Sequence, residues 1–362
     1  MNRKETVQIE VLRVFCILTM MWVHVSPGLG TPSVIDGGTF DLVGDVLGQT
    51  LGRISVTTLS FVSGYLFWLS GPEKSIWEIF RKRFVRILLP MLVWSAIFIL
   101  MATVKEVVFE RQSSALQSIG GTEMDMVNAL TGITGTTANE SLFFLRDLFV
   151  ATLILRLVAP LIRAHPAFLI AVAAVITVLN CTEPILFRPI ILLFMLIGAT
   201  AAQQNLTITR LSSPGISLTL GLLFSVIGAL ASPEIVQDST IAERALDVVR
   251  RLGVGFIIIT MISSVTELFP TERLVQWGRS SFLAYLIHVP LIGVLWVVWT
   301  SLVGDERQTT YLAFFLAAPF IVFRLAESFG QILDRCPHSI QLLARGRVIR
   351  GDEARDTQEN FR

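Results

Sequence analysis

The chain consists of long apolar runs separated by short breaks that are charged or rich in proline and glycine. A helix needs about 20 apolar residues to cross the hydrocarbon core of a bilayer, and successive runs of this kind fill most of residues 7–333. The pattern predicts ten membrane-spanning helices and leaves no room for a separate soluble domain. Their expected bounds are 8–29, 46–70, 85–104, 142–162, 167–182, 185–203, 214–231, 252–268, 281–301 and 309–332.

The fifth and sixth helices are short and are interrupted at residues 180–189, "NCTEPILFRP". This stretch places Pro184 and Pro189 beside two charged residues, Glu183 and Arg188. Helix-breaking residues at membrane depth are tolerated where they line a cavity in the protein, and they are excluded from lipid-facing surfaces. We therefore expect the segment to border a cavity.

Basic residues gather in two regions and indicate which side of the membrane each region occupies. The segment "EKSIWEIFRKRFVR" at 73–86 and the C-terminal tail both hold several. Basic loops favour the cytoplasmic side, and an even number of helices then puts the N-terminus, with Arg3 and Lys4, on that side too. We expect two cytoplasmic termini and an outward-facing polar loop at 105–140. The basic residues are Lys74, Arg81, Lys82, Arg83, Arg86, Arg335, Arg345, Arg347 and Arg350.

The composition agrees with a membrane protein and excludes an ordinary soluble domain. Of 362 residues, 53% are hydrophobic and 16% are charged, whereas soluble domains have roughly 25% charged residues. The mean hydropathy is +0.68. We predict an all-α polytopic membrane protein of about ten transmembrane helices, with one integral domain at 1–335 and a cytoplasmic tail at 336–362.

Two further features narrow the class of protein. The three cysteines, Cys16, Cys181 and Cys336, are widely separated, which indicates neither a disulfide framework nor a zinc site, so no metal is expected. Arg13 interrupts the first apolar run and no small-residue cleavage site follows it. We therefore expect a retained first helix and not a secretory signal.

The first helix carries three ionisable residues that lipid disfavours. Glu10 and Arg13 are three residues apart, so they lie on one helical face and are able to pair. His24 follows Arg13 by eleven residues, or about three turns, which places it on the same face about 16 Å away. A buried structural network would explain these residues. Ionisable residues inside a membrane nevertheless favour function, and histidine is well suited to proton transfer near neutral pH.

A second group, Lys82, Arg83 and Arg86, leads into the third helix. The preference of basic residues for the cytoplasmic side explains their presence without any further role. Arg83 and Arg86 are three apart, however, and two guanidinium groups on one helical face also suit the binding of phosphates by paired hydrogen bonds. The spacing alone leaves both interpretations open.

A third polar group lies at the predicted outer end of the fourth helix, in "ESLFFLRDLFVATLI". Arg146 and Asp147 are adjacent, so we expect them to point in different directions and to need partners elsewhere. Together with Glu140 they form either a vestibule for a hydroxyl-rich substrate or an interfacial salt-bridge network. In the ninth helix, His288 either faces the same cavity as Arg13 or donates a hydrogen bond to another helix.

The order of these motifs resembles the bacterial acyltransferase 3 family of integral membrane acyltransferases. The first helix, "IEVLRVFCILTMMWVH", resembles the opening signature of that family, with an acidic residue, an arginine three later and a histidine after ten more. Later markers follow in the expected order: "FVSGYLF", "KRFVRILLPMLVW", "SLFFLRDLFVATLI" and "SSFLAYLIHVPLI". Residues 143–145 read Phe-Phe-Leu where Trp-Phe-Leu is common, and the soluble esterase-like domain of some members is absent.

The resemblance implies O-acyl transfer from cytosolic acetyl-CoA, with succinyl-CoA as the alternative donor, to a bacterial exopolysaccharide, O-antigen or glucan, or to its lipid-linked precursor. By the family pattern His24 is the catalytic histidine, beside Glu10 and Arg13. Arg83 and Arg86, with Lys82 next to them, match an Arg-x-x-Arg element for the CoA phosphates. The expected place is the bacterial cytoplasmic (inner) membrane, with a carbohydrate acceptor and membrane lipid as partners and no nucleic acid.

The residues leave two questions open. His24 acts either as a general base on the acceptor hydroxyl or as a nucleophile that carries the acyl group. A transporter is the competing class, because discontinuous helices such as the fifth and sixth often mark transport sites. The sequence shows no paired repeat of the kind that many transporters have, and it does not indicate an oligomeric state.

Overall fold

A computed structural model describes residues 3–25, 43–109, 119, 121–208, 219, 221–223, 240–268, 271–304 and 308–348. The described residues form helices and no strand, which confirms the all-α prediction. Within them, five helical segments are long and apolar enough to cross a membrane: Arg3–Val25, Ile76–Val107, Ile241–Leu268, Leu274–Val303 and Thr310–Leu333. Two shorter apolar helices span Pro166–Leu179 and Pro189–Gln203. These features are those of a multi-pass membrane protein.

Most of the expected helices have a counterpart, although their bounds differ. The predicted helix at 214–231 lies mostly outside the described residues. The predicted helix at 252–268 begins earlier, at Ile241, for a reason given below. The helices that correspond to the predicted ones are α1 (Arg3–Val25), α3 (Arg53–Leu69), α5 (Leu89–Phe109), α8 (Phe143–Ala164), α9 (Pro166–Leu179), α10 (Ile190–Gln203), α13 (Ile241–Leu268), α14 (Glu272–Val303) and α15 (Gln308–Leu333).

The chain forms two compact units, each built from two separate stretches of sequence. Unit 1 comprises residues 1–74 and 151–279, and unit 2 comprises residues 75–150 and 280–362. Helices α8 and α14 each contribute residues to both units.

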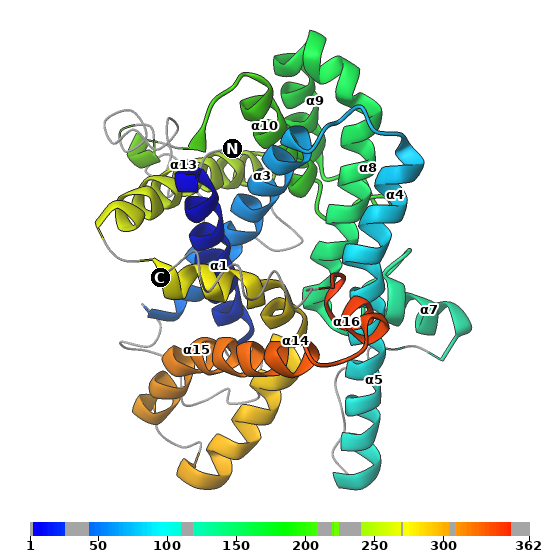
Figure 1. Cartoon of the computed structure of the whole chain (residues 1–362), viewed down its shortest axis with the longest axis vertical. Helices are drawn as coiled ribbons and strands as arrows, with labels where there is room; N and C mark the ends of the chain where they lie inside the picture. The colour runs from blue at the N-terminus through cyan, green and yellow to red at the C-terminus, as the bar shows by residue number, and fades with distance from the viewer. Residues whose placement is uncertain are drawn as a thin grey trace. The chain divides into compact units, whose positions relative to one another are not determined.

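In unit 1, α3 packs against α1, α10 and α13 (Figure 1). Its contact with α10 depends on glycines: a Cβ atom on Gly64 would overlap the backbone of Met195, and one on Gly198 would overlap the backbone of Phe61. Small residues let membrane helices approach closely, where van der Waals contact replaces the missing hydrophobic driving force. Gly64, part of the "FVSGYLF" motif, therefore has a packing role.

One face of α1 is attached to its neighbours by polar contacts. The buried Glu5 carboxylate accepts a hydrogen bond from the Tyr65 hydroxyl of α3 at 2.5 Å. The Gln8 amide donates to the Ser263 hydroxyl of α13 at 2.9 Å. Near the other end of α1, the hydroxyl groups of Thr19 and Ser55 are hydrogen-bonded. These bonds satisfy polar groups that would be costly to leave unpaired in a membrane.

In unit 2, α4 (Ile76–Arg83) continues through a π-helical turn, η2 (Phe84–Leu88), into α5. Ser75 caps α4, because its hydroxyl accepts a hydrogen bond from the Glu78 backbone at 3.1 Å. Pro90 has no N–H group to donate to the carbonyl of Arg86, four residues earlier, which accounts for the irregular turn there. The basic segment is thus helical from Ile76 to Arg86.

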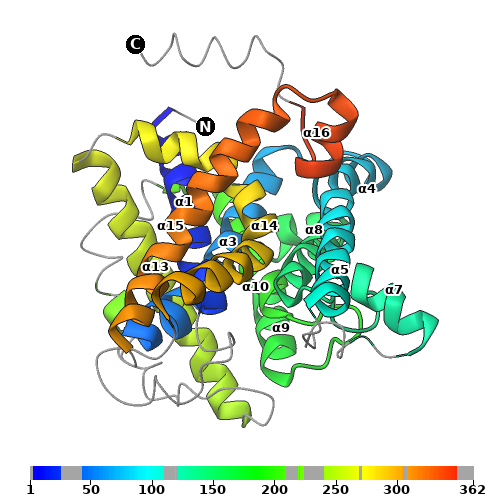
Figure 2. The ribbon, with the colours of Figure 1, turned by 90° about the horizontal axis from the view of Figure 1, so that it is seen from below.

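The predicted tail at 336–362 includes a helix, α16 (His338–Arg345), which packs on α5 and η2. The Trp94 indole of α5 donates to the Ala344 carbonyl at 2.9 Å, and Arg345 forms a 2.6 Å ion pair with Asp334. Both ribbon views show α16 beside the α4 end of the α4–α5 helix (Figures 1 and 2). The two basic regions of the sequence therefore meet at one end of unit 2. Residues 349–362 lie outside the described part of the chain.

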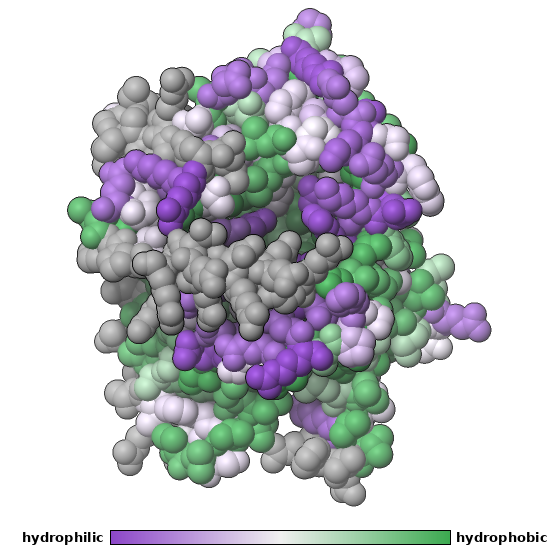
Figure 3. All heavy atoms as spheres, in the orientation of Figure 1, coloured by the Kyte–Doolittle hydropathy of each residue, from purple (hydrophilic) through white to green (hydrophobic). Residues whose placement is uncertain are grey.

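The surface of unit 2 includes apolar side chains on the second half of α14. Val294, Val298 and Leu302 are exposed, and apolar side chains gather over the lower end of this helix (Figure 3). Exposed apolar residues along a long helix are typical of a surface that faces lipid.

Candidate active site

The predicted pair on α1 is present. The Arg13 Nη1 atom lies 3.0 Å from Glu10 Oε1, and both side chains are partly exposed, Arg13 by 39% and Glu10 by 24%. His24 is half-buried in the last turn of the same continuous helix. At about 100° per residue, Glu10, Arg13 and His24 fall within a narrow arc. We call these three residues the reactive stripe.

The reactive stripe lies on the other side of α1 from the packing contacts. Glu5, Gln8 and Thr19 also fall within one arc, whose centre is about 140° around the helix from that of the stripe. The bonds to α3 and α13 thus hold one face of α1 and direct the stripe away from those helices. A helix fixed in rotation by three polar contacts can present its remaining ionisable groups in a defined direction.

Gly278 of α14 provides the space for the Glu10 side chain. A Cβ atom on this buried glycine would lie 2.6 Å from Glu10 Oε2 and 3.1 Å from its Cβ atom. Gly278 cannot be recognised from the sequence, because a lone glycine in an apolar helix carries no signal of what it faces. Its position makes it a candidate positioning residue for the Glu10–Arg13 pair.

The second predicted group, Lys82, Arg83 and Arg86, lies in unit 2 along the end of α4 and in η2. Lys82 and Arg86 are exposed and Arg83 is half-buried. Arg86 occupies the π-helical turn, a rare conformation that occurs often at functional sites. Three cationic side chains in about one turn of helix produce a positive surface that suits phosphate groups.

The backbone of Arg86 is held by the C-terminal segment. Gly346, which ends α16 in a left-handed conformation with φ of 66°, comes so close that a Cβ atom there would overlap the Arg86 backbone. Only glycine combines this φ value with such a close approach. The contact fixes the main chain of the π-helical turn without occupying the Arg86 side chain.

The third predicted group differs from the expectation in one respect. Arg146 and Asp147 were expected to need partners elsewhere, but they pair with each other, with 2.7 Å between Arg146 Nη1 and Asp147 Oδ1. The long guanidinium side chain reaches the carboxylate of its neighbour although the two Cα atoms point in different directions. Arg146 Nη2 also donates to the Ile133 carbonyl at 3.0 Å. Both residues are buried, with 8% and 0% exposure.

His288 is fully buried in α14, and its Nδ1 atom is hydrogen-bonded to the Tyr285 carbonyl in the same helix. The Tyr285 hydroxyl donates to the Ser141 carbonyl in η3 (Glu140–Leu142). Tyr285 therefore joins the middle of α14 to the start of α8, where Arg146 and Asp147 lie. The fourth predicted residue, Glu140, is exposed at the beginning of η3.

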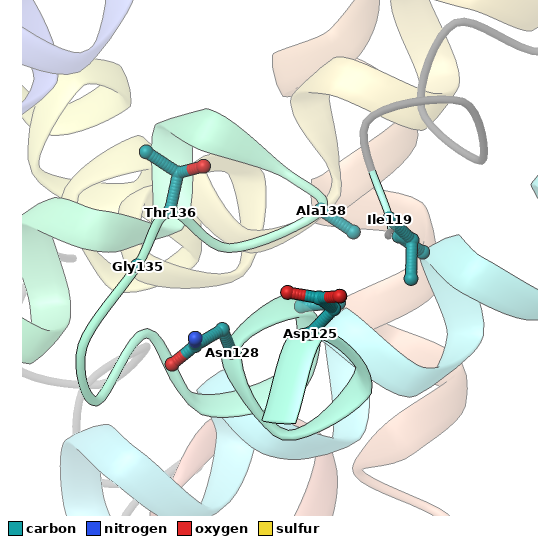
Figure 4. A pocket seen from close by; sticks show the side chains of 7 residues that line it. Ile119, Asp125, Asn128, Gly135, Thr136 and Ala138 are labelled. Carbon is teal, nitrogen blue, oxygen red and sulfur yellow. The ribbon is translucent and has the colours of Figure 1, made fainter. Parts of the chain in front are cut away.

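A small pocket of about 160 Å³ lies in the predicted outward loop, next to α7 (Glu123–Thr131) (Figure 4). Its polar lining includes Asp125 and Asn128, and both side chains already form hydrogen bonds within the loop. Hydrogen bonds from the Thr122 hydroxyl and backbone hold the pKa of Asp125 below its ordinary value. Asn128 Oδ1 accepts from the Thr134 backbone at 2.9 Å. The pocket contains none of the predicted site residues and is smaller than typical ligand pockets of about 300 Å³ or more.

Comparisons with known proteins agree with the resemblance described above. The profile of a family described as an acyltransferase domain matches residues 6–324. The succinoglycan biosynthesis protein ExoH of Rhizobium meliloti (strain 1021) is 26% identical over 353 residues, which cover 92% of this chain and 90% of that protein. No solved structure matches the chain. The match includes the reactive stripe and the Arg83–Arg86 segment, and the chain therefore belongs to the acyltransferase 3 family of membrane acyltransferases.

Proposed function

We propose that the protein is an O-acetyltransferase that moves the acetyl group of cytosolic acetyl-CoA to a hydroxyl of a bacterial surface polysaccharide or of its lipid-linked precursor. The observation that carries the proposal is the reactive stripe, in which a histidine and an ion pair share one face of α1 within the region of the family match. Membership in an acyltransferase family supplies the reaction class. The similarity to a succinoglycan biosynthesis protein supports a polysaccharide as the acceptor.

His24 is the residue proposed to handle the proton. In the general-base route its imidazole takes the proton of the acceptor hydroxyl while the hydroxyl oxygen attacks the thioester carbon. The C–S bond then breaks, and the proton passes to the departing thiolate, giving the ester and free CoA. In the nucleophilic route the imidazole nitrogen attacks the thioester carbon, the C–S bond breaks, and the thiolate leaves as free CoA with the imidazole proton. The acceptor hydroxyl then attacks the acyl-imidazole, the C–N bond breaks, and the hydroxyl proton returns to the imidazole.

The Glu10–Arg13 pair is proposed to set the electric field and the hydrogen bonds along the stripe. About three turns separate Arg13 from His24, so neither partner of the pair exchanges a proton with the imidazole directly. The partial exposure of both side chains leaves them accessible to a substrate group.

Arg83 and Arg86, with Lys82, are proposed to hold the CoA phosphates. The exposure of Lys82 and Arg86 and the positive charge of the helix end support this role, as does the fixed backbone at Arg86. Arg146, Asp147, Glu140 and His288 are proposed to border the acceptor site. Because Arg146 and Asp147 neutralise each other, they would shape that site and leave direct contact with the sugar to exposed groups such as Glu140.

The proposed place is the bacterial inner membrane, with both termini in the cytoplasm. The meeting of the two basic regions at one end of unit 2 supports this topology, because basic segments favour the cytoplasmic side. Donor binding on that side would then coincide with the compartment that contains acyl-CoA.

Analysis of the surface polysaccharide from a strain that lacks the protein tests the proposal. We expect one O-acetyl ester to be missing and to return with the wild-type gene, but not with a His24→Ala variant that reaches the membrane at the same level. A missing succinyl ester would replace acetyl by succinyl as the donor group. An unchanged ester content with less polysaccharide at the cell surface would contradict the enzyme and favour the transporter.

A further inference from the structure

The first turns of α13 contain a charged cluster that the apolar pattern did not assign to a helix. Asp247 is buried, with 8% exposure. Its two oxygens accept hydrogen bonds from Arg250 Nη2 and Arg251 Nε, each at 2.7 Å. The side chains of these arginines are only 13% and 15% exposed. Reciprocal hydrogen bonds between Thr240 and Glu243 cap the helix at Ile241, and the charges are compatible with it because they pair at spacings of three and four residues.

A third arginine, Arg53, belongs to this cluster. Arg251 Nη1 donates to the Arg53 carbonyl at 2.9 Å, which joins α13 to the first residue of α3. The charged neighbours of the Arg53 side chain include Arg188, Arg250, Arg251 and Asp247. We call Arg53, Arg250 and Arg251 the arginine cluster. Among the residues that the structure describes, three guanidinium groups thus lie near one carboxylate.

Within the described part of the chain, the charges of the cluster do not balance. Like charges in a low-dielectric setting are costly unless an opposite charge compensates them, and among these residues Asp247 supplies one negative charge to the three positive charges of the cluster. The buried Nε atom of Arg250 has no hydrogen-bond acceptor within the described part of the chain. Helix α10 begins directly after Arg188 and Pro189 and adds the positive end of its dipole. The arrangement suits an anion with several oxygen acceptors.

The cluster lies at the His24 end of unit 1. Gly52, next to Arg53, is so close to α1 that a Cβ atom would be 2.7 Å from the Thr19 carbonyl oxygen. Contacts of Lys4 with Glu267 and of Gln8 with Ser263 show that α1 and α13 run antiparallel. This register brings the end of α1 level with the start of α13.

The cluster is separate from the reactive stripe. It lies on the side of α1 that faces α3 and α13, whereas the stripe lies about 140° around that helix. A substrate group held by the cluster would be at the depth of His24 without touching it. The predicted topology places this end of unit 1 at the outer face of the membrane, where the glycan acceptor would arrive.

We propose that the arginine cluster binds an oxyanion of the glycan acceptor, either a phosphate of its lipid-linked form or a carboxylate of an acidic sugar. This inference rests on the proposed function for the identity of the ligand, although the anion site itself does not. Guanidinium groups form paired hydrogen bonds with both phosphate and carboxylate. The site would hold an extended acceptor at a point away from the reacting hydroxyl.

Binding is tested on the purified full-length protein in neutral detergent, with inorganic pyrophosphate and sodium glucuronate as probes. A ligand that binds the folded state raises the midpoint of thermal unfolding. We expect at least one probe to raise it, whereas sodium chloride at equal ionic strength does not. Arg250→Gln should weaken the apparent affinity by about tenfold or more, since it removes a charged donor. Arg251 still neutralises Asp247 in that variant.

Arg244→Gln is the matched control, because Arg244 lies on the same helix and donates to the Leu179 carbonyl at 3.2 Å. It should bind the probes like the wild type. A wild type that responds to neither probe, or an Arg250→Gln variant that responds equally, would overturn the anion site. The relative strength of the two probes distinguishes phosphate from carboxylate. A response abolished by phosphatidylglycerol in nanodiscs, but not by phosphatidylcholine, would assign the site to a lipid headgroup and overturn the acceptor assignment.

Transfer kinetics give a separate readout. In Arg250→Gln we expect the KM for an anionic acceptor to rise about tenfold or more, with kcat and the KM for acyl-CoA unchanged. An unchanged acceptor KM would overturn the role in acceptor binding. If the wild type binds the probes but transfers no acyl group, the proposed function fails while the anion site stands.

Discussion

The polar residues on the two faces of α1 differ in their burial and in their hydrogen-bond partners. On one face, Glu5 and Gln8 are buried and bonded to residues of neighbouring helices. On the other, Glu10 and Arg13 are partly exposed and pair with each other along the same helix. Polar groups inside a membrane protein either hold helices together or serve chemistry. The contacts of Glu5 and Gln8 give the first role to one face, and the exposure of the Glu10–Arg13 pair supports the proposed role in chemistry for the face that carries His24.

The largest expected effect is on catalysis and comes from His24. His24→Gln keeps a polar side chain but removes a group that exchanges protons near neutral pH. We expect acyl transfer to fall by about 10²–10⁴-fold, the usual contribution of a general acid–base group, and the thermal unfolding midpoint to stay unchanged. Initial rates with radiolabelled acyl-CoA measure this loss. A variant with nearly full activity would remove His24 from the mechanism.

A substitution on the opposite face of α1 should lower the stability of the protein and leave its catalysis intact. Glu5→Ala leaves the Tyr65 hydroxyl without its acceptor and removes the 3.4 Å contact with the Ile208 backbone. We expect a loss of about 1–3 kcal/mol in the free energy of unfolding, with the transfer rate per folded molecule retained. Thermal or denaturant unfolding in detergent measures the change. If turnover fell while stability did not, the division between the faces would be wrong.

Gly278→Ala tests the link between packing and the reactive stripe. The added methyl group displaces the Glu10 carboxylate, so we expect transfer to fall about tenfold while stability changes by less than about 1 kcal/mol. Gly293→Ala on the same helix is the matched control, because a Cβ atom there meets no heavy atom within 4 Å. Equal activity of the two variants would show that the position of Glu10 is unimportant.

The smallest effect is expected from Arg13→Lys. The variant keeps the positive charge opposite Glu10 but loses the planar fork of donors. We expect a decrease in kcat of a few fold, about 0.5–1 kcal/mol in activation free energy, and an unchanged unfolding midpoint. Arg324→Lys is a suitable control, since Arg324 also pairs with a glutamate three residues away. A larger loss in the control than in Arg13→Lys would contradict a special role for the stripe.

The sequence predicted the features that depend on local spacing. Apolar runs identified the long helices, because a membrane span needs a fixed length of apolar residues. The interval of three between Glu10 and Arg13 predicted their ion pair, since helical geometry alone brings such residues together.

The sequence did not predict, or predicted wrongly, the features that depend on tertiary contacts. The charges of Asp247 and its arginines led to the prediction of a loop at the start of α13. Internal pairing makes these charges compatible with a helix. Gly278 has no local signal, since its role comes from Glu10 in another helix. The pairing of Arg146 with its neighbour depends on the reach of a long side chain, which sequence position does not reveal.

The most direct test compares acyl transfer per folded molecule in the His24→Ala and Glu5→Ala variants of the purified protein. The assay uses radiolabelled acetyl-CoA, with succinyl-CoA in parallel, and a glycan acceptor prepared from the strain that lacks the protein. We predict that His24→Ala is folded and inactive, whereas Glu5→Ala is less stable but transfers at the wild-type rate per folded molecule. A folded His24→Ala variant that still transfers the acyl group at the wild-type rate would contradict this prediction.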